Sequence, residues 1–140
     1  MENNNLYTVN EIKRIIESSV PAGLQESWDN SGLCIGSPED EVSSILIGLD
    51  CTEALVDEAV SCGADMIITH HPLIFSGLKK ISPDDQTGAA VIKAVRAGIC
   101  IYAAHTSADK VIAGVSGAMA AKLGLTDVEI LEEDGEGTGL

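Results

Sequence analysis

The sequence predicts an α/β fold with a mostly parallel sheet flanked by helices. Short apolar segments alternate with segments whose apolar residues recur at helical spacing, which is typical of strand–helix–strand units. Polar residues hardly interrupt the apolar segments, as expected for parallel strands that are covered on both faces. A length of 140 residues suffices for one hydrophobic core, so we expect a single α/β domain over residues 1–140.

The first predicted element is a helix within the segment TVNEIKRIIESSV. Thr8 and Glu11 have the spacing of a capping box, and the isoleucines that follow recur at helical spacing. Pro21 and Gly23 end this helix. The following segment, ESWDNSGLCIGSPED (26–40), is rich in Asn, Ser, Gly and Pro and therefore predicts a loop.

The rest of the chain predicts alternating strands and helices. Two of the helices have clear ends. Thr52 is a good cap for the helix that Gly63 closes, and Gly98 closes the next helix. We expect the strand over 43–50 to be fully buried. The predicted order is strand 43–50, helix 52–63, strand 64–71, loop 72–85, helix 86–98, strand 99–105, helix 110–124 and a short strand 127–131.

Composition excludes several classes of function. The net charge of −14 argues against a nucleic-acid surface, which requires clustered Lys and Arg, and against binding to anionic membranes. No apolar run approaches the roughly 18 residues of a membrane span, and the N-terminus has no signal-peptide pattern, so we expect a cytoplasmic protein. The four cysteines form no C-x-x-C pair and are expected to be buried, reduced thiols.

All three histidines fall at the carboxyl ends of predicted strands. The strand over 43–50 ends in Asp50, the next ends in His70 and His71, and the third ends in His105, with Asp109 four residues later. In a parallel sheet these ends share one edge, and ligands bind in the crevice outside it. Imidazole and carboxylate together suit divalent zinc, iron, manganese or nickel, so we predict a metal site at this edge.

The adjacency of His70 and His71 suggests more than one ion. Neighbouring side chains on a regular strand point to opposite faces, so the backbone must turn if both rings are to act at one site. Pro72 favours an extended conformation at His71 and removes a ladder donor, which is consistent with the strand ending there. The two rings could then diverge toward two ions, with a carboxylate such as Asp109 bridging them at a separation of roughly 3.5–4 Å.

Several of these residues also have simpler interpretations. A histidine at a strand end is often only a hydrogen-bonded structural residue, and Asp50 could cap the helix that starts near Thr52. The turn Trp28–Asn30 could merely anchor its loop to the core. The segment GEGTG (135–139) lacks the Lys and the following helix of a phosphate loop, and the acidic end over 131–140 is typical of a linker or a lead-in to further chain.

Four segments carry a resemblance to a known family. SWDNSGLCIG, ILIGLDCTEALVDEA, ADMIITHHPLIFSGLKKI and IYAAHTSADKVIAGVSGAMAAKLGL resemble the dinuclear metal-centre family, whose members are described as GTP cyclohydrolase 1 type 2 homologues or NIF-three-like proteins. The resemblance implies that His70, His71 and Asp109 bind two divalent metals and that His105 is a catalytic or ligand-orienting group. The chain has Ser107-Ala108 where the family usually has Asn-Leu or Asn-Tyr.

The resemblance covers the N-terminal half of a two-lobed family fold. Family members continue into a second α/β half that supplies a further His and Glu, and that half is absent from these 140 residues. The chain would then carry three of five expected protein ligands. Either it is a truncated piece, or another chain completes it. Family members assemble into ring-shaped homo-oligomers, so a homo-oligomer is expected where the rest of the fold is supplied.

The function expected from these observations is divalent-metal binding in a di-metal hydrolase module. A metal-activated water would attack a small-molecule substrate, a nucleotide being one candidate, and His105 would orient a ligand or shuttle a proton. No phosphate loop or basic cradle in the sequence indicates GTP. The alternative is a non-enzymatic metal-binding, scaffold or regulatory protein with an incomplete site.

Overall fold

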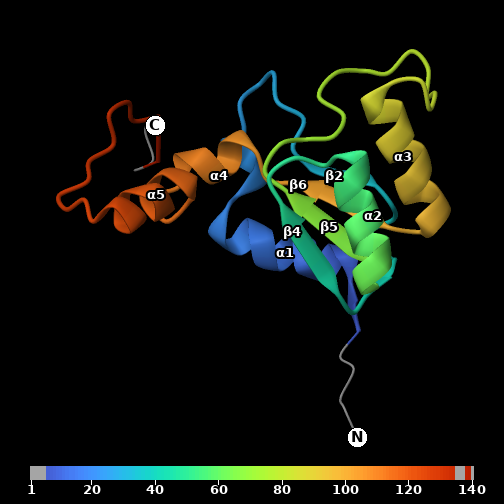
Figure 1. Cartoon of the computed structure of the whole chain (residues 1–140). Coiled ribbons are helices and arrows are strands. Elements are labelled where there is room, and N and C mark those ends of the chain that lie inside the picture. Colours follow the sequence, from blue (N-terminus) through green and yellow to red (C-terminus); the bar gives the residue numbers. More distant parts are fainter. Residues whose placement is uncertain (1–5, 135–137, 140) are drawn as a thin grey trace, which may run out of the picture.

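A four-stranded sheet with strand order β2-β6-β5-β4 forms the centre of the chain (Figure 1). The computed structural model describes residues 6–134 and 138–139. β4, β5 and β6 run parallel, whereas β2 pairs antiparallel with β6, so the predicted α/β fold with a mostly parallel sheet is confirmed. The strands are β2 (Gly32–Ile35), β4 (Ile45–Gly48), β5 (Met66–Thr69) and β6 (Cys100–Ala103), and β1 (Tyr7–Thr8) pairs separately with β3 (Glu41–Val42).

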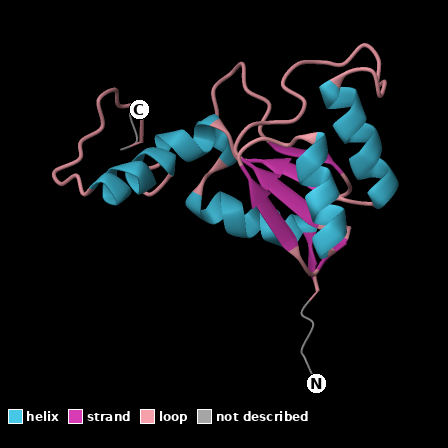
Figure 2. Ribbon diagram, in the orientation of Figure 1, coloured by secondary structure: helices cyan, strands magenta, loops and turns pink. Residues whose placement is uncertain are grey.

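Helices cover both faces of the sheet (Figure 2). Ile67 and Ile101 pack against α2 and α3 in one core cluster, whereas Met66 and Tyr102 pack against α1 in another. Alternate residues of β5 and β6 therefore point into opposite clusters, as the pleat of a strand requires. The helices are α1 (Val9–Ser19), α2 (Glu53–Cys62), α3 (Gln86–Ala97), α4 (Thr106–Lys110) and α5 (Val115–Leu123), with a short 3₁₀ turn at Ala22–Leu24.

The helix ends agree with the predicted ones for the first three helices. Thr8 and Glu11 form the capping box at the start of α1, and the Thr52 side chain accepts a hydrogen bond from the backbone N–H of Leu55 in α2. Gly63 and Gly98 end α2 and α3 in the left-handed conformation, which glycine adopts without a Cβ penalty.

The segment 26–40 is not only a loop, because it contains β2. Leu33 pairs with Tyr102 and Ile35 with Ile101, so β2 covers the free edge of β6. β2 begins at Gly32 and is followed by Gly36, and the two glycines have φ near +107° and +105°. The strand was missed because its few apolar residues stand among residues typical of turns. Its position matters, since it brings the preceding turn to the carboxyl end of β6.

Three other expectations about elements are wrong. The predicted helix 110–124 is broken, because α5 begins only after Gly114, whose N–H is bonded to the Val111 carbonyl. No strand forms over 127–131 among the described residues. β4 is not fully buried: it lies at the sheet edge, and Ile47 is 76% exposed while Leu46 packs on the α2–α3 cluster.

The cysteines are free in the described structure, and three of them avoid solvent at least in part. Burial raises the pKa of Cys34, Cys51 and Cys100 to about 11, which keeps these thiols protonated and unreactive near neutral pH. The expectation of burial is wrong for Cys62, which is exposed at the end of α2.

The GEGTG segment and the last residue lie partly outside the described residues, since residues 135–137 and 140 are not described. α5 and residues 125–134 after it extend away from the sheet (Figure 1), and Ala120 is the buried residue of that helix. No helix in the described ranges combines the length and the hydropathy that crossing a membrane requires.

Candidate metal centre

The three histidines of the chain meet just beyond the carboxyl ends of β5 and β6. The ring centroids are 4.8 Å apart for His70 and His71, 5.3 Å for His70 and His105, and 5.5 Å for His71 and His105. One nitrogen from each ring can be chosen such that all three lie within 4.8 Å of one another. Two strands and the turns after them thus place three potential donor atoms around one small volume.

The chain turns immediately after β5, and this turn allows adjacent histidines to share one site. The strand ends at Thr69, whose hydroxyl donates to the backbone carbonyl of His71 at 2.8 Å. The backbone N–H groups of His70 and His71 donate to the carbonyls of Gly48 and Leu49, which keeps the turn attached to the end of β4. The two rings stand at 60° to each other and remain close, so whether they serve one ion or two stays a prediction.

Asp50 holds the ring of His71. Its carboxylate Oδ1 lies 2.7 Å from Nδ1 of His71, while the capping of α2 belongs to Thr52. An ionised carboxylate only accepts hydrogen bonds, so Nδ1 carries the proton and Nε2 of the neutral ring keeps its lone pair. A carboxylate behind a histidine in this way fixes the ring orientation and raises its basicity toward a metal.

Asp29 holds the ring of His105 in the same manner, but from a buried position. Its Oδ1 lies 2.9 Å from Nδ1 of His105, and its side chain has no exposed surface. The other oxygen accepts from the hydroxyl of Ser31 and from both the backbone N–H and the hydroxyl of Thr106. The Trp28–Asn30 turn, for which a purely structural role was open, therefore contacts the site through its central residue.

Burial and hydrogen bonding act in opposite directions on Asp29. Burial alone would raise the pKa of its carboxyl group, but the hydrogen bonds from Thr106, His105, Ser31 and the backbone of Asn30 outweigh it and hold the pKa far below the ordinary range. Asp29 is consequently a permanent anion at physiological pH. The Nδ1–H of His105 faces that anion, which leaves Nε2 of His105 directed away from it.

Asp109 brings a carboxylate next to the cluster. It lies in α4, which follows directly after His105, and its Oδ2 is 3.6 Å from Nε2 of His70. The next residue, Lys110, is paired with Glu26 at 2.8 Å, so its ammonium group is directed to a different carboxylate. The sequence-predicted residues His70, His71, His105 and Asp109 are thus near neighbours, although their roles as ligands stay predictions.

A cavity of about 530 Å³ opens beside His71. Asp50 and Glu53 give it an acidic character, and Thr52, Gln86 and Thr87 supply uncharged hydrogen-bonding groups. No Lys or Arg lines it. The lining residues are Asp50, Cys51, Thr52, Glu53, Ala54, His71, Pro72, Leu73, Gln86 and Thr87.

The donor set fits a divalent transition metal. Three imidazoles and a carboxylate are ligands that zinc, iron, manganese and nickel accept, and two of the imidazoles are already oriented by carboxylates. Fold and site together define an α/β protein with a histidine-rich candidate metal centre at the carboxyl edge of a parallel sheet. The chain belongs to the Duf34/NIF3 (NGG1p interacting factor 3) family, whose model matches residues 7–140.

Individual relatives agree with this membership. A Clostridium perfringens protein named GTP cyclohydrolase 1 type 2 homolog is 38% identical over 125 residues, which cover 89% of this chain and 48% of the relative. A Clostridium acetobutylicum protein of the same name is 39% identical over 126 residues, covering 90% of this chain and 47% of the relative. The chain therefore spans about half the length of these curated relatives.

Solved structures show the same fold. The crystal structure of a Bacillus cereus protein related to NIF3 aligns with a TM-score of 0.87 at 42% identity, over 91% of this chain and 35% of that one. A Staphylococcus aureus protein aligns with a TM-score of 0.86 at 35% identity, over 89% of this chain and 36% of that one. The resemblance seen in the sequence motifs is confirmed at the level of family and fold.

Proposed function

We propose that this chain is the metal-binding part of a metal-dependent hydrolase module, with His70, His71 and Asp109 as ligands of divalent ions. The observation that carries the proposal is the convergence of three imidazoles within 4.8 Å, with the Asp109 carboxylate 3.6 Å from His70. Three imidazoles gain little by gathering at one rim, whereas a shared cation gives that arrangement a physical reason.

The carboxylates behind the histidines support the same proposal. Asp50 and Asp29 each accept from an Nδ1–H, so Nε2 is the nitrogen of His71 and of His105 that remains able to bind an ion. Ligating histidines commonly have such partners, and the partners tune metal affinity. The arrangement of hydrogen bonds is therefore that of a site prepared for cations.

His105 is proposed to act on protons in this site. Divalent ions held there would lower the pKa of a coordinated water and polarise the substrate. His105 is fixed through Nδ1 by Asp29, and its Nε2 can accept a proton or orient a neighbouring group. The side chain is 16% exposed, so it is within reach of a small molecule that enters the cluster.

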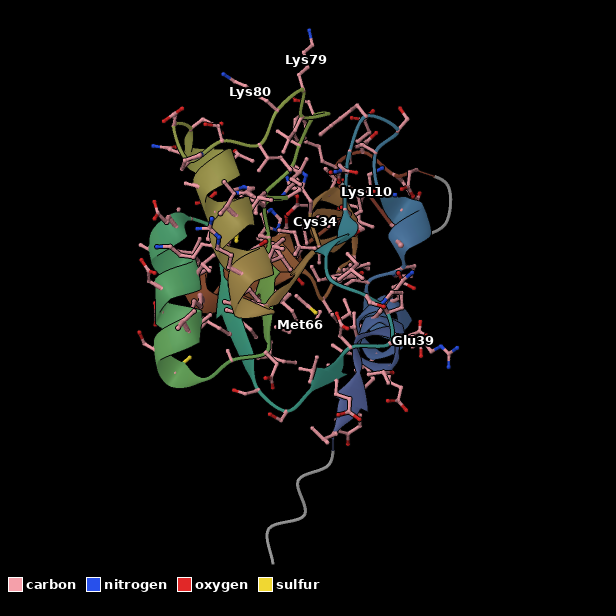
Figure 3. All side chains as sticks on the ribbon, turned by 90° about the vertical axis from the view of Figure 1, so that its right-hand side faces the viewer. Cys34, Glu39, Met66, Lys79, Lys80 and Lys110 are labelled. Carbon is pink, nitrogen blue, oxygen red and sulfur yellow. The ribbon has the colours of Figure 1, made fainter. Side chains whose placement is uncertain are left out.

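The substrate is proposed only as a small molecule. The relatives named GTP cyclohydrolase 1 type 2 homolog make a nucleotide one candidate. A basic cradle for phosphates is absent among the described residues that line the cavity at His71. Lys79 and Lys80 project from the loop after β5 away from the body (Figure 3).

The domain arrangement is also proposed. Residues 1–140 correspond to the N-terminal half of a longer family fold, whose second half would add ligands and support a homo-oligomer. The coverage of about half of the curated relatives supports this assignment. A cytoplasmic location fits the expected reduced cysteines, which are free in the described structure.

A second candidate is metal binding without turnover, as in a scaffold or regulatory protein. The donor set favours it, because three imidazoles and one close carboxylate are few ligands for two ions. Binding would then affect a partner or the stability of the fold, and no chemistry would follow.

An activity panel separates the two candidates. The chain is loaded with zinc, iron, manganese or nickel and assayed for hydrolysis of nucleotides and phosphoesters, with His70→Ala as the matched control. Metal-dependent turnover that His70→Ala abolishes supports the hydrolase. Bound metal without turnover supports the second candidate, and turnover that survives in His70→Ala contradicts the assignment of this site as the catalytic centre.

A further inference from the structure

Two of the four aromatic residues stand exposed beside the histidine cluster. Trp28 is 59% exposed and Phe75 is 52% exposed, although Tyr102 is almost completely buried. The centroid of each ring lies 6.3 Å from that of His105, and the two rings are 6.0 Å apart. The ring of Trp28 therefore lies at the surface next to the site, which speaks against the simpler interpretation that the turn only anchors its loop to the core.

The surrounding structure fixes both rings in place. Asn30, two residues after Trp28, donates its side-chain N–H to the carbonyl of Ile74, the residue before Phe75. Asp29, the residue between Trp28 and Asn30, is buried and bonded to His105. The loop before β2 and the loop after β5 are thus joined at the point where they present the two rings.

Exposure of two large rings has a cost that a ligand would remove. Leaving an aromatic side chain in water forfeits part of the free energy that its burial provides, and this chain has few aromatic residues for its core. Flat exposed rings beside a polar centre are well suited to stack on planar ligands, because every such ligand offers a π-face.

We propose that Trp28 and Phe75 bind a planar aromatic or heteroaromatic ring of the substrate and hold it next to His105. This deepens the proposed function by naming a substrate class, and for catalysis it rests on that function. Binding of the ring itself requires only the two side chains. Trp28 and Phe75 are tilted by 55° and already in contact, so the ligand stacks on an exposed face of the pair and does not enter between the rings.

In the chain without bound metal, the carboxylates beside the histidine cluster favour a ring without negative charge. Each histidine of the cluster has a carboxylate partner: Asp109 for His70, Asp50 for His71 and Asp29 for His105. Recognition would therefore come from stacking and hydrogen bonding. We infer a neutral planar ring, such as a nucleobase or an aromatic amide, as the group that binds.

Trp28 is the only tryptophan, so its fluorescence reports directly on this surface. The full chain is titrated with benzamide and, as the saturated counterpart, cyclohexanecarboxamide; guanosine and ribose form a second matched pair. We expect saturable quenching by benzamide and guanosine and none by the saturated partners. Quenching that rises linearly without saturation, or that is equal for both members of a pair, overturns the proposal.

Variants test each ring separately. Phe75→Leu is expected to weaken the binding of guanosine by about fivefold or more, in line with the loss of one stacking contact. Val95→Ala, at an exposed position near the end of α3, serves as a control and should leave the affinity unchanged. Trp28→Leu, followed by equilibrium dialysis of labelled guanosine, should show a comparable loss. Unchanged affinity in both ring variants overturns the proposal.

His70→Ala distinguishes this proposal from the proposed function. The variant lacks a proposed metal ligand but keeps both rings, so we expect it to bind guanosine within about twofold of the unmodified chain. Ring binding without any hydrolysis would leave the aromatic surface established and contradict only the hydrolase assignment. Hydrolysis together with equal binding of planar and saturated probes would support the hydrolase assignment and contradict the aromatic surface.

Discussion

The carboxylate of Asp29 lies 2.9 Å from Nδ1 of His105, and it joins the turn before β2 to the turn after β6. The side chain of Asp29 is completely enclosed, and its charge is balanced by hydrogen bonds rather than by a Lys or Arg. The residue therefore combines two roles. It anchors the loop that carries Trp28, and it leaves Nε2 as the nitrogen of His105 that can accept a proton or bind an ion.

Removal of the Asp29 carboxylate should destabilise the chain. Asp29→Ala leaves the partly buried donors of Thr106 and Ser31 without their acceptor, which is expected to lower the free energy of unfolding by about 2–3 kcal/mol. Urea denaturation followed by circular dichroism measures this change. Glu39→Ala, at an exposed position, should change stability by less than about 0.5 kcal/mol. Equal effects of the two substitutions would contradict the role given to Asp29.

Removal of the Asp50 carboxylate should affect metal affinity and leave stability nearly unchanged. Asp50 is 59% exposed and contacts Nδ1 of His71, so Asp50→Ala mainly releases the orientation of that ring. We expect zinc affinity to fall by about 10- to 100-fold. Glu53→Ala removes a charge from the same cavity without touching a histidine. A similar loss of affinity in both variants would show that only bulk charge matters.

A fall in pH should weaken the hydrogen bonds of Asp65, which is not part of the candidate metal centre. Asp65 accepts from the hydroxyl and backbone N–H of Ser43 and from the backbone of Ser44, and these hydrogen bonds lower its pKa. A lowered folded-state pKa contributes stability that is complete above the unfolded value of about 3.9 and disappears as the pH falls below it. Asp65→Asn should therefore lower stability at pH 7 by about 1–2 kcal/mol, after allowance for solvent screening.

The measurement for Asp65 is urea unfolding between pH 7 and pH 3. The difference between Asp65→Asn and the unmodified chain should be constant near neutrality and shrink toward the acid end. A difference that grows as the pH falls would contradict the assignment.

Metal should stabilise this chain without being required for its folding. The two core clusters are formed by apolar residues of the sheet and of α1, α2 and α3, so removal of metal with EDTA should leave the circular dichroism spectrum unchanged. Free zinc at about 100 times its Kd should add about 2.7 kcal/mol and raise the Tm by several degrees. Unfolding upon addition of EDTA would contradict this expectation.

The strongly periodic parts of the fold could be predicted from the sequence. The capping box at Thr8 and the left-handed glycines Gly63 and Gly98 are local features, and their predicted roles are confirmed. The break at Gly114 and the exposure of Ile47 were missed because both depend on tertiary packing. A sequence pattern does not reveal that β4 is an edge strand with one side uncovered.

The candidate site was only partly predictable for a related reason. Three histidines at strand ends could be recognised from spacing and topology, which place them on one edge. The roles of Asp29 and Trp28 could not be recognised in this way, because their nearness to His105 follows from the antiparallel pairing of β2 with β6. That strand is four residues long and lies in a polar segment. The signal available in the sequence was the only Trp of the chain, followed directly by Asp and Asn.

X-ray absorption at the zinc edge tests the central claim most directly, because it counts the imidazoles bound to the ion. The chain is loaded with one equivalent of zinc, and His70→Ala is measured in parallel. We predict scattering from at least two imidazoles with Zn–N distances of about 2.0–2.1 Å, and fewer in the variant. A zinc shell made of oxygen atoms alone, with the same spectrum in His70→Ala, would contradict the account.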